Sequence, residues 1–278
     1  SLDSFDLCVI AANALDNALR ACGEAEGEPF LRVRGERQGD FYRLEFENSC
    51  APGPPPEPGT GLRNIRAAAE KNLRSPFRLP IDRVFSVDGF GTVVTGTLIE
   101  GALAVGDMAE VLPTGFQARV RNLQVHGKDV ETAFAGQRVA VNLAGTRKAD
   151  LARGDTIAKP DTVRRSLMLD VRLQNLKNSQ RTILTGSQVH LYHGSSVRLS
   201  KVVLLDRDAL QPGESCYAQL RMTEELAAKC GDRFVVRFYS PLETIGGGVV
   251  LDDCPQRHKR GDGRVLESLA IRESGSGD

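Results

Sequence analysis

The chain has 278 residues, of which 41% are hydrophobic and 26% are charged, and its 36 basic residues cancel its 36 acidic ones. This composition supplies enough apolar side chains for buried cores and excludes a largely disordered chain, and bulk charge alone does not drive the protein onto nucleic acid. Because no run of about 18 apolar residues, no signal sequence and no C-x-x-C motif is present, we expect a cytoplasmic protein with reduced cysteines and no membrane partner.

The first part of the chain mixes helical and strand patterns. Apolar residues recur at helical spacing over 6–22, and two alternating runs over 31–46 are typical of a β-hairpin. A proline-rich loop then leads to a second helical pattern over 62–71. These patterns predict a small α+β unit in residues 1–73.

Strand patterns dominate the chain beyond Pro76. Asp88-Gly89 lies between two alternating runs and predicts a hairpin, and Gly246-Gly247-Gly248 allows close approach of backbones. Short strands at near-regular spacing favour antiparallel β-barrels. We therefore predict a mainly β fold with one barrel in 74–163, a second in 164–254, and a linker with a short helix in 255–278. Further strands are expected at 108–112, 118–125, 137–143, 166–173, 188–192, 196–205, 215–222, 233–239 and 249–251.

Three residues of the first predicted barrel form a candidate anion site. Asp82 and Arg83 lie at the beginning of one strand, and Arg138 lies on another. If the strands converge, two guanidinium groups oriented by one carboxylate suit a small anionic group. The alternative is an ordinary ion pair between strand ends, which the residues alone favour.

The charge distribution adds a second signal. Residues 119–181 contain 13 basic and 6 acidic residues. This surplus indicates a basic face for phosphates or, equally, basic side chains spread over the outer faces of strands.

The sequence contains no recognisable catalytic motif. The P-loop pattern G-x-x-x-x-G-K-S/T is absent. His190 and His193 are three residues apart in an expected strand, so they point to opposite faces and do not suit a shared metal. By their own chemistry, the barrel residues indicate binding rather than a reaction.

The N-terminal segment has two features suited to phosphates. Asn13 and Asn17 share one face of the first expected helix, and amide oxygens are ligands that Mg²⁺ accepts. Gly59 and Gly61 precede the second helix, whose N-terminus can receive an anion. Each feature alone is more typical of a surface or capping asparagine and of an ordinary turn.

Together, DLCVIAANALDNALRAC, LEFENSCAP and GTGLRNIRAAAEK resemble the GHKL ATP-binding domain of sensor histidine kinases. The resemblance implies Mg-ATP as a ligand, with Asn13 and Asn17 at the Mg²⁺-phosphate site and Gly59 and Gly61 over the phosphates. The adenine-reading D-x-G-x-G motif of that family is absent, and Glu47-Asn48-Ser49 occupies its region.

A second resemblance covers residues 76–254. PFRLPIDRVFSVDGFGTVVTGTLIEGALAVGD, GQRVAVNLAG, RGDTIAKP and RFVVRFYSPLETIGGGVVLD resemble the second and third domains of the bacterial selenocysteine-specific translation elongation factors. GTVVTG is shared with the wider elongation factor Tu group, whereas IDRVF, YSPLETIGGG and PQRHKR narrow the resemblance to the selenocysteine branch. VLESL resembles the beginning of the winged-helix region of that family.

This resemblance implies two β-barrels that hold the acceptor arm and T stem of a charged tRNA, with the ribosome as a further partner. Asp82, Arg83 and Arg138 fall on the motif positions of a cationic pocket for the selenocysteinyl group. A selenol is largely ionised at neutral pH, so arginines favour it over the neutral hydroxyl of serine. The basic residues of 119–181 then contact phosphates without reading sequence.

We therefore expect a partial selenocysteine-specific elongation factor that binds selenocysteinyl-tRNA. The family implies GTP and Mg²⁺, but its GTPase domain and messenger-binding winged helices are expected to be absent, so neither GTP hydrolysis nor a messenger hairpin is expected. Whether the chain is an enzyme stays open in the sequence. The alternatives are an ATP-binding histidine kinase fragment and a non-functional chimera joined near 72–75.

Overall fold

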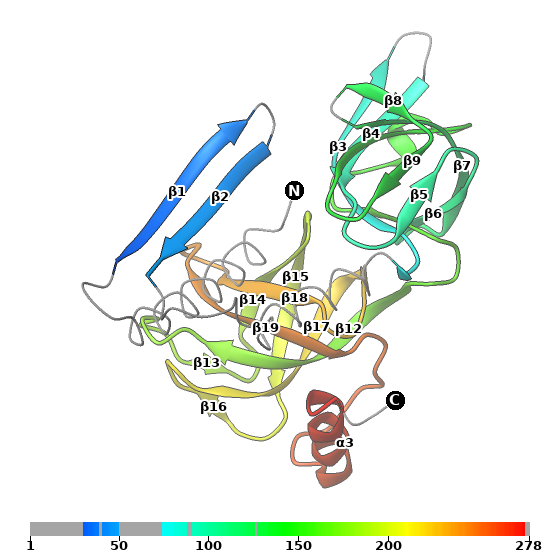
Figure 1. The fold of residues 1–278 in the computed structure, drawn as a ribbon. Coiled ribbons are helices and arrows are strands. Elements are labelled where there is room, and N and C mark those ends of the chain that lie inside the picture. Colours follow the sequence, from blue (N-terminus) through cyan, green and yellow to red (C-terminus); the bar gives the residue numbers. More distant parts are fainter. Residues whose placement is uncertain (1–29, 39–40, 50–73, 88–90, 126, 276–278) are drawn as a thin grey trace.

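The computed structural model describes residues 30–38, 41–49, 74–87, 91–125 and 127–275 (Figure 1). Strand β1 (Leu31–Gln38) pairs antiparallel with β2 (Phe41–Asn48), which confirms the hairpin expected from the alternating pattern. The helices expected at 6–22 and 62–71 lie outside the described residues. No helix of the described part is long and apolar enough to cross a membrane.

The first barrel closes from six antiparallel strands in the order β10-β4-β3-β11-β6-β7, with β10 pairing again with β7. Buried side chains alternate with exposed ones along β7, where Ala118 and Val120 point inward and Arg119 and Arg121 point outward. This alternation places one face of each strand in the core. The six strands are β3 (Arg78–Val87), β4 (Gly91–Thr97), β6 (Met108–Leu112), β7 (Phe116–Val125), β10 (Arg138–Leu143) and β11 (Thr156–Ala158).

Short elements complete this barrel. Strand β8 (Lys128–Val130) extends the sheet beside β7, and β5 (Ala102–Ala104) pairs with β9 (Thr132–Phe134) in a separate ribbon. A 3-10 turn, η1 (Lys148–Asp150), precedes β11. Strands this short have too few residues to show a period, which is why the sequence pattern did not indicate them.

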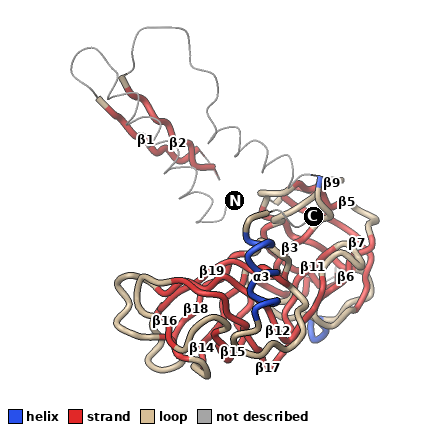
Figure 2. The backbone as a smooth tube through the Cα atoms, turned by 90° about the horizontal axis from the view of Figure 1, so that it is seen from below, coloured by secondary structure: helices blue, strands red, loops and turns tan. Residues whose placement is uncertain are grey.

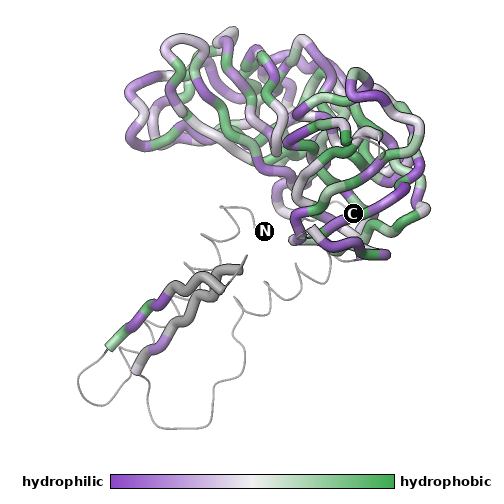
Figure 3. Tube along the Cα trace, turned by 90° about the horizontal axis from the view of Figure 1, so that it is seen from above, coloured by the Kyte–Doolittle hydropathy of each residue, from purple (hydrophilic) through white to green (hydrophobic). Residues whose placement is uncertain are grey.

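The second barrel is also closed and antiparallel, in the order β12-β17-β15-β14-β18-β19. Figure 3 shows hydrophobic and hydrophilic residues alternating along the strands of both barrels. Its strands are β12 (Arg164–Asn175), β14 (Gln188–His193), β15 (Ser196–Leu204), β17 (Ser215–Ala228), β18 (Arg233–Phe238) and β19 (Thr244–Asp252), with a small ribbon of β13 (Ile183–Leu184) and β16 (Ala209–Leu210). Both barrels lie within the residue ranges expected from the sequence. The exact limits of the domains stay predictions.

The helix expected near the C-terminus is present as α3 (Gly263–Glu273), which packs against the second barrel (Figure 2). The side chain of Leu269, on this helix, is buried together with Leu205 and Leu251 of the second barrel. The Tyr217 hydroxyl donates a hydrogen bond to Glu273 Oε2 at 2.6 Å. The helix is therefore fixed to the barrel by apolar and polar contacts. The cysteines in the described residues, Cys216, Cys230 and Cys254, are free thiols.

The three glycines of β19 allow the close backbone approach that the sequence indicated. A Cβ atom on Gly248 would collide with the carbonyl oxygen of Arg172 on β12 and lie 3.0 Å from Phe234 Cζ. Gly246 and Gly247 meet the backbone of β12 and β18 in the same way. Side chains at these positions are excluded because carbonyl oxygens of the neighbouring strands occupy the space that each Cβ atom would need.

We expect Gly248→Ala to lower the free energy of unfolding by about 1–3 kcal/mol, because the added methyl group overpacks the barrel wall against backbone. Gly263→Ala is the matched control, since a Cβ there meets nothing within 4 Å and alanine favours a helix. Urea unfolding followed by circular dichroism measures both variants. Equal stability of the two variants would contradict the close packing of β19 against β12 and β18.

Candidate anion site on the first barrel

Two of the three residues predicted to form the anion site are in direct contact. Arg138 begins β10 and Asp82 lies on β3, with β4 between these strands. Arg138 Nη1 donates to Asp82 Oδ2 at 2.5 Å, and Nη2 donates to Oδ1 at 3.0 Å. A two-point contact of this kind fixes the plane of the guanidinium group.

A β-bulge places the carboxylate. The register between β3 and β4 shifts between Ile81, which pairs with Gly96, and Arg83, which pairs with Thr95, so Asp82 is the extra residue. The Thr95 hydroxyl donates to Asp82 Oδ1 at 2.8 Å. A side chain on Gly96 would collide with the Pro80 carbonyl oxygen. The last Thr-Gly of the GTVVTG motif thus holds Asp82 and admits the close approach of β3.

Arg83 differs from Arg138 in its contacts. It is exposed, and within the described residues its side chain forms no hydrogen bond or ion pair, although its charge acts on Asp82. Burial raises the pKa of Asp82, but hydrogen bonds from Arg138 and Thr95 and the charges of Arg138 and Arg83 outweigh it and hold the pKa below its ordinary value. Asp82 is therefore ionised at neutral pH.

The group of three has two cations and one anion, and it is open to solvent. The side chains of Arg138 and Asp82 are 47% and 29% exposed. An exposed ion pair contributes little to stability, about 0–1 kcal/mol, so its main effect is to orient Arg138. One oriented and one uncommitted guanidinium group then remain available to a small anion from solvent.

An aromatic and cationic surface lies on the second barrel and was missed by the sequence analysis. The rings of His190 and Tyr239 are stacked, with centroids 5.4 Å apart and planes at 12°. The Arg237 guanidinium lies 5.7 Å from the centroid of the Tyr192 ring. We call these four residues the aromatic face. Tyr239 is exposed and the other three are half-buried, with Arg237 Nη2 donating to the Leu242 carbonyl oxygen at 3.2 Å. Rings and a guanidinium group at a surface are typical of regions that contact ribose, bases and phosphate.

The aromatic face comes from strands far apart in sequence. His190 pairs with Arg237 across β14 and β18, a register that no local pattern indicates. The outward positions of His190 and Tyr192 on their strand were the one available signal, since the intervening Leu191 is buried. Such alternation indicates exposure and gives no information about neighbouring strands.

The basic residues of 119–181 do not act as one uncommitted surface. Arg147, Arg172 and Arg181 are ion-paired with Asp150, Glu273 and Glu243. The candidate nucleotide residues of the N-terminal segment, Asn13, Asn17, Gly59 and Gly61, lie outside the described residues.

Family models match three parts of the chain. The model for elongation factor Tu domain 2 matches residues 91–158, and the model for the β-barrel domain of the selenocysteine-specific elongation factor matches residues 170–257. The GHKL domain model matches residues 2–75. The first match covers the first barrel from β4 to β11, and the second covers the second barrel from within β12 onward.

Whole-sequence comparisons give the same assignment. The selenocysteine-specific elongation factor of Desulfomicrobium baculatum is 43% identical over 202 residues, which are 73% of this chain and 32% of the relative. That of Haemophilus influenzae is 34% identical over 233 residues, 79% of this chain and 36% of the relative. Elongation factor Tu 2 of Streptomyces avermitilis is 30% identical over 185 residues, 65% of this chain and 47% of the relative.

The chain thus spans 32% and 36% of the length of these two selenocysteine-specific relatives. These relatives and the barrel matches do not favour the histidine kinase or the chimera as the function of the chain. With a GHKL-like segment before them, the two barrels of this chain form a partial factor that resembles the selenocysteine-specific elongation factors.

Proposed function

We propose that the two barrels bind selenocysteinyl-tRNA in the cytoplasm for delivery to the ribosome, and that Asp82, Arg83 and Arg138 read the selenocysteinyl group. The observation that carries the proposal is the position of both arginines at one carboxylate, with Arg138 oriented by it and Arg83 uncommitted. We assign no residue of this chain to GTP binding, because the sequence contains no P-loop motif.

The charge of the amino acid supplies the selectivity. A selenol is ionised at neutral pH, whereas the hydroxyl of serine is neutral. Two unit charges 4 Å apart near a protein surface interact by about 4 kcal/mol, and a tenfold preference needs only about 1.4 kcal/mol. About a third of the Coulomb energy between the selenolate and one arginine is therefore sufficient for a tenfold preference.

The aromatic face supports the proposal from the second barrel. Folded RNA stems are recognised through phosphates and 2′-hydroxyl groups rather than through base sequence. Arg237 supplies a positive charge for a phosphate, and the stacked rings of His190 and Tyr239 supply a flat surface for ribose. Contacts of this kind bind every tRNA alike, which leaves amino-acid selection to the first barrel.

Arg83→Ala and Arg138→Ala should each reduce the preference for selenocysteinyl-tRNA over seryl-tRNA by about tenfold, because each removes a charge that attracts the selenolate. Equilibrium binding of the two charged tRNAs measures the preference. Arg147→Ala, which removes an exposed ion-paired arginine from the same barrel, should leave it unchanged. Equal affinity of the unaltered protein for both tRNAs would contradict the proposal.

The preference should also fall as the pH is lowered from 7.5 to 5. The lowered pKa of Asp82 keeps the carboxylate ionised over this range, and the arginines stay protonated, so the change comes from protonation of the selenolate. Seryl-tRNA affinity is the internal control, because its hydroxyl does not titrate. A preference that is constant over this range would exclude recognition by charge.

Arg237→Gln should weaken the binding of both tRNAs equally, because it removes a phosphate contact and leaves the anion site intact. The slope of log affinity against log salt concentration should become about one unit less steep. Lys201→Gln, which removes an exposed charge from β15, is the control on the same barrel. An unchanged salt dependence in Arg237→Gln would remove the aromatic face from the proposed RNA contact.

A further inference from the structure

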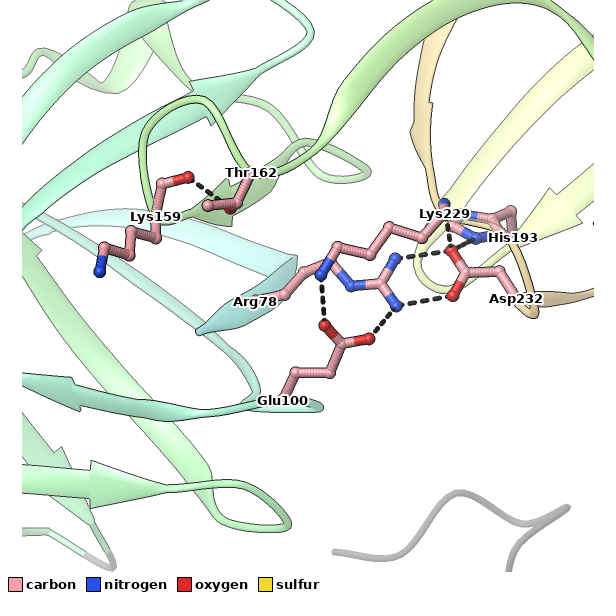
Figure 4. Close-up of polar contacts among 7 residues, drawn as sticks. All are labelled: Arg78, Glu100, Lys159, Thr162, His193, Lys229 and Asp232. Carbon is pink, nitrogen blue, oxygen red and sulfur yellow. Dashed lines mark hydrogen bonds and ion pairs between the residues drawn. The ribbon is translucent and has the colours of Figure 1, made fainter. Parts of the chain in front are cut away.

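Five ionisable residues join the two barrels (Figure 4). Arg78, at the beginning of β3, donates from Nη1 to Asp232 Oδ2 at 2.6 Å and from Nη2 to Asp232 Oδ1 at 2.6 Å, which is a two-point contact across the junction. Its Nη2 also donates to Glu100 Oε1 at 2.7 Å. We call the group the inter-barrel clamp, and its members are Arg78 and Glu100 of the first barrel and His193, Lys229 and Asp232 of the second.

The clamp is reciprocal. Lys229 Nζ of the second barrel donates to Glu100 Oε2 of the first at 2.6 Å, and His193 Nε2 lies 2.8 Å from Asp232 Oδ2. The carboxylate of each barrel therefore contacts a cation of the other. The positive charges of Arg78 and Lys229 balance the negative charges of Glu100 and Asp232.

Burial makes the geometry of the clamp specific. The side chains of Arg78 and Asp232 are 4% and 12% exposed. Burial raises the pKa of Asp232, but hydrogen bonds from Arg78 and His193 outweigh it and hold the pKa far below its ordinary value. Removing one partner of a buried pair leaves an uncompensated charge. These contacts therefore restrict the orientation of one barrel relative to the other.

An apolar cluster lies at the same junction. Leu112, Ala158 and Val163 of the first barrel and its linker are buried together with Ala227 of β17. Arg165 Nη1 donates to the Pro113 carbonyl oxygen at 2.8 Å. Relative motion is the default for two domains of one chain, so these contacts are a specific restriction on it.

Three of the five clamp residues lie on, or next to, strands that carry the two candidate contact surfaces. Arg78 precedes Asp82 on β3 by four residues, about 13 Å along a strand. His193 follows His190 on β14 by three residues, about 10 Å. Asp232 immediately precedes β18, the strand of Arg237. Any rotation at the clamp therefore moves the anion site relative to the aromatic face.

We propose that the inter-barrel clamp is a positioning device that fixes the spacing and angle between the anion site of the first barrel and the aromatic face of the second, so that one RNA contacts both at once. This inference rests on the proposed function. Two contacts held at a matched spacing bind with an avidity that a mobile junction loses. The clamp residues touch no RNA in this arrangement and act through the strands that they hold.

Residual dipolar couplings measured by NMR on the full chain without RNA test the clamp directly. We expect one alignment tensor to fit both barrels in the unaltered protein and in the control Arg147→Met, whose ion pair lies within the first barrel. In Arg78→Met the two barrels should require separate tensors. Glu100→Gln removes one charge with little change of shape and provides a second, milder variant. One shared tensor in both clamp variants would overturn the inference.

Affinity for selenocysteinyl-tRNA is the second readout. Arg78→Met should weaken binding by about 10- to 100-fold and leave the preference over seryl-tRNA unchanged, because the anion site itself stays intact. Separate tensors with unchanged affinity would overturn the positioning role. If the unaltered protein binds no tRNA, the proposed function fails and the positioning role fails with it, whereas the dipolar couplings still report whether the clamp fixes the barrels.

Discussion

Closure of the first barrel through β10 is the constraint on which the candidate site depends. This strand pairs with β4 on one side and with β7 on the other, and it thereby brings Arg138 to Asp82, 56 residues earlier in the chain. Backbone hydrogen bonds of a closed sheet leave little freedom in strand position. The contact between the two side chains is therefore imposed by the barrel rather than by their own weak attraction.

The bulge at Asp82 gives the two arginines different roles. In a regular strand, Asp82 and Arg83 would point to opposite faces of the sheet. The extra residue changes this alternation, so that Asp82 meets Thr95 and Arg138 while the charge of Arg83 still acts on it. One guanidinium group is thereby oriented and the other stays uncommitted, which suits an incoming anion better than two closed ion pairs.

The Asp82–Arg138 and Arg78–Asp232 ion pairs serve different ends because their exposure differs. The Asp82–Arg138 pair lies at the surface, where an anion from solvent can compete with the carboxylate. The Arg78–Asp232 pair is buried between the barrels, where no solvent anion replaces either partner and a missing partner is costly. The exposed pair suits ligand binding, and the buried pair suits fixed geometry.

Much of the architecture was determined by local sequence. The alternation in 108–112 predicted β6 with its observed bounds, the Asp88-Gly89 signal predicted the pairing of β3 with β4, and the short helix expected in 255–278 is α3. Asp82, Arg83 and Arg138 were also candidates from sequence, because their chemistry and motif positions are local properties. Short strands such as β5 and β13 carry too few residues for a period to be recognised.

Only the tertiary structure decided which distant residues meet. Arg78 and Asp232 are 154 residues apart, and neither lies in a pattern that distinguishes a buried charge from a solvated one. The pairing of His190 with Arg237 likewise depends on the register between β14 and β18. A strand's own sequence determines which side chains point outward, whereas barrel closure and barrel docking determine what those side chains contact, because both depend on hydrogen bonds and packing between segments far apart in the chain.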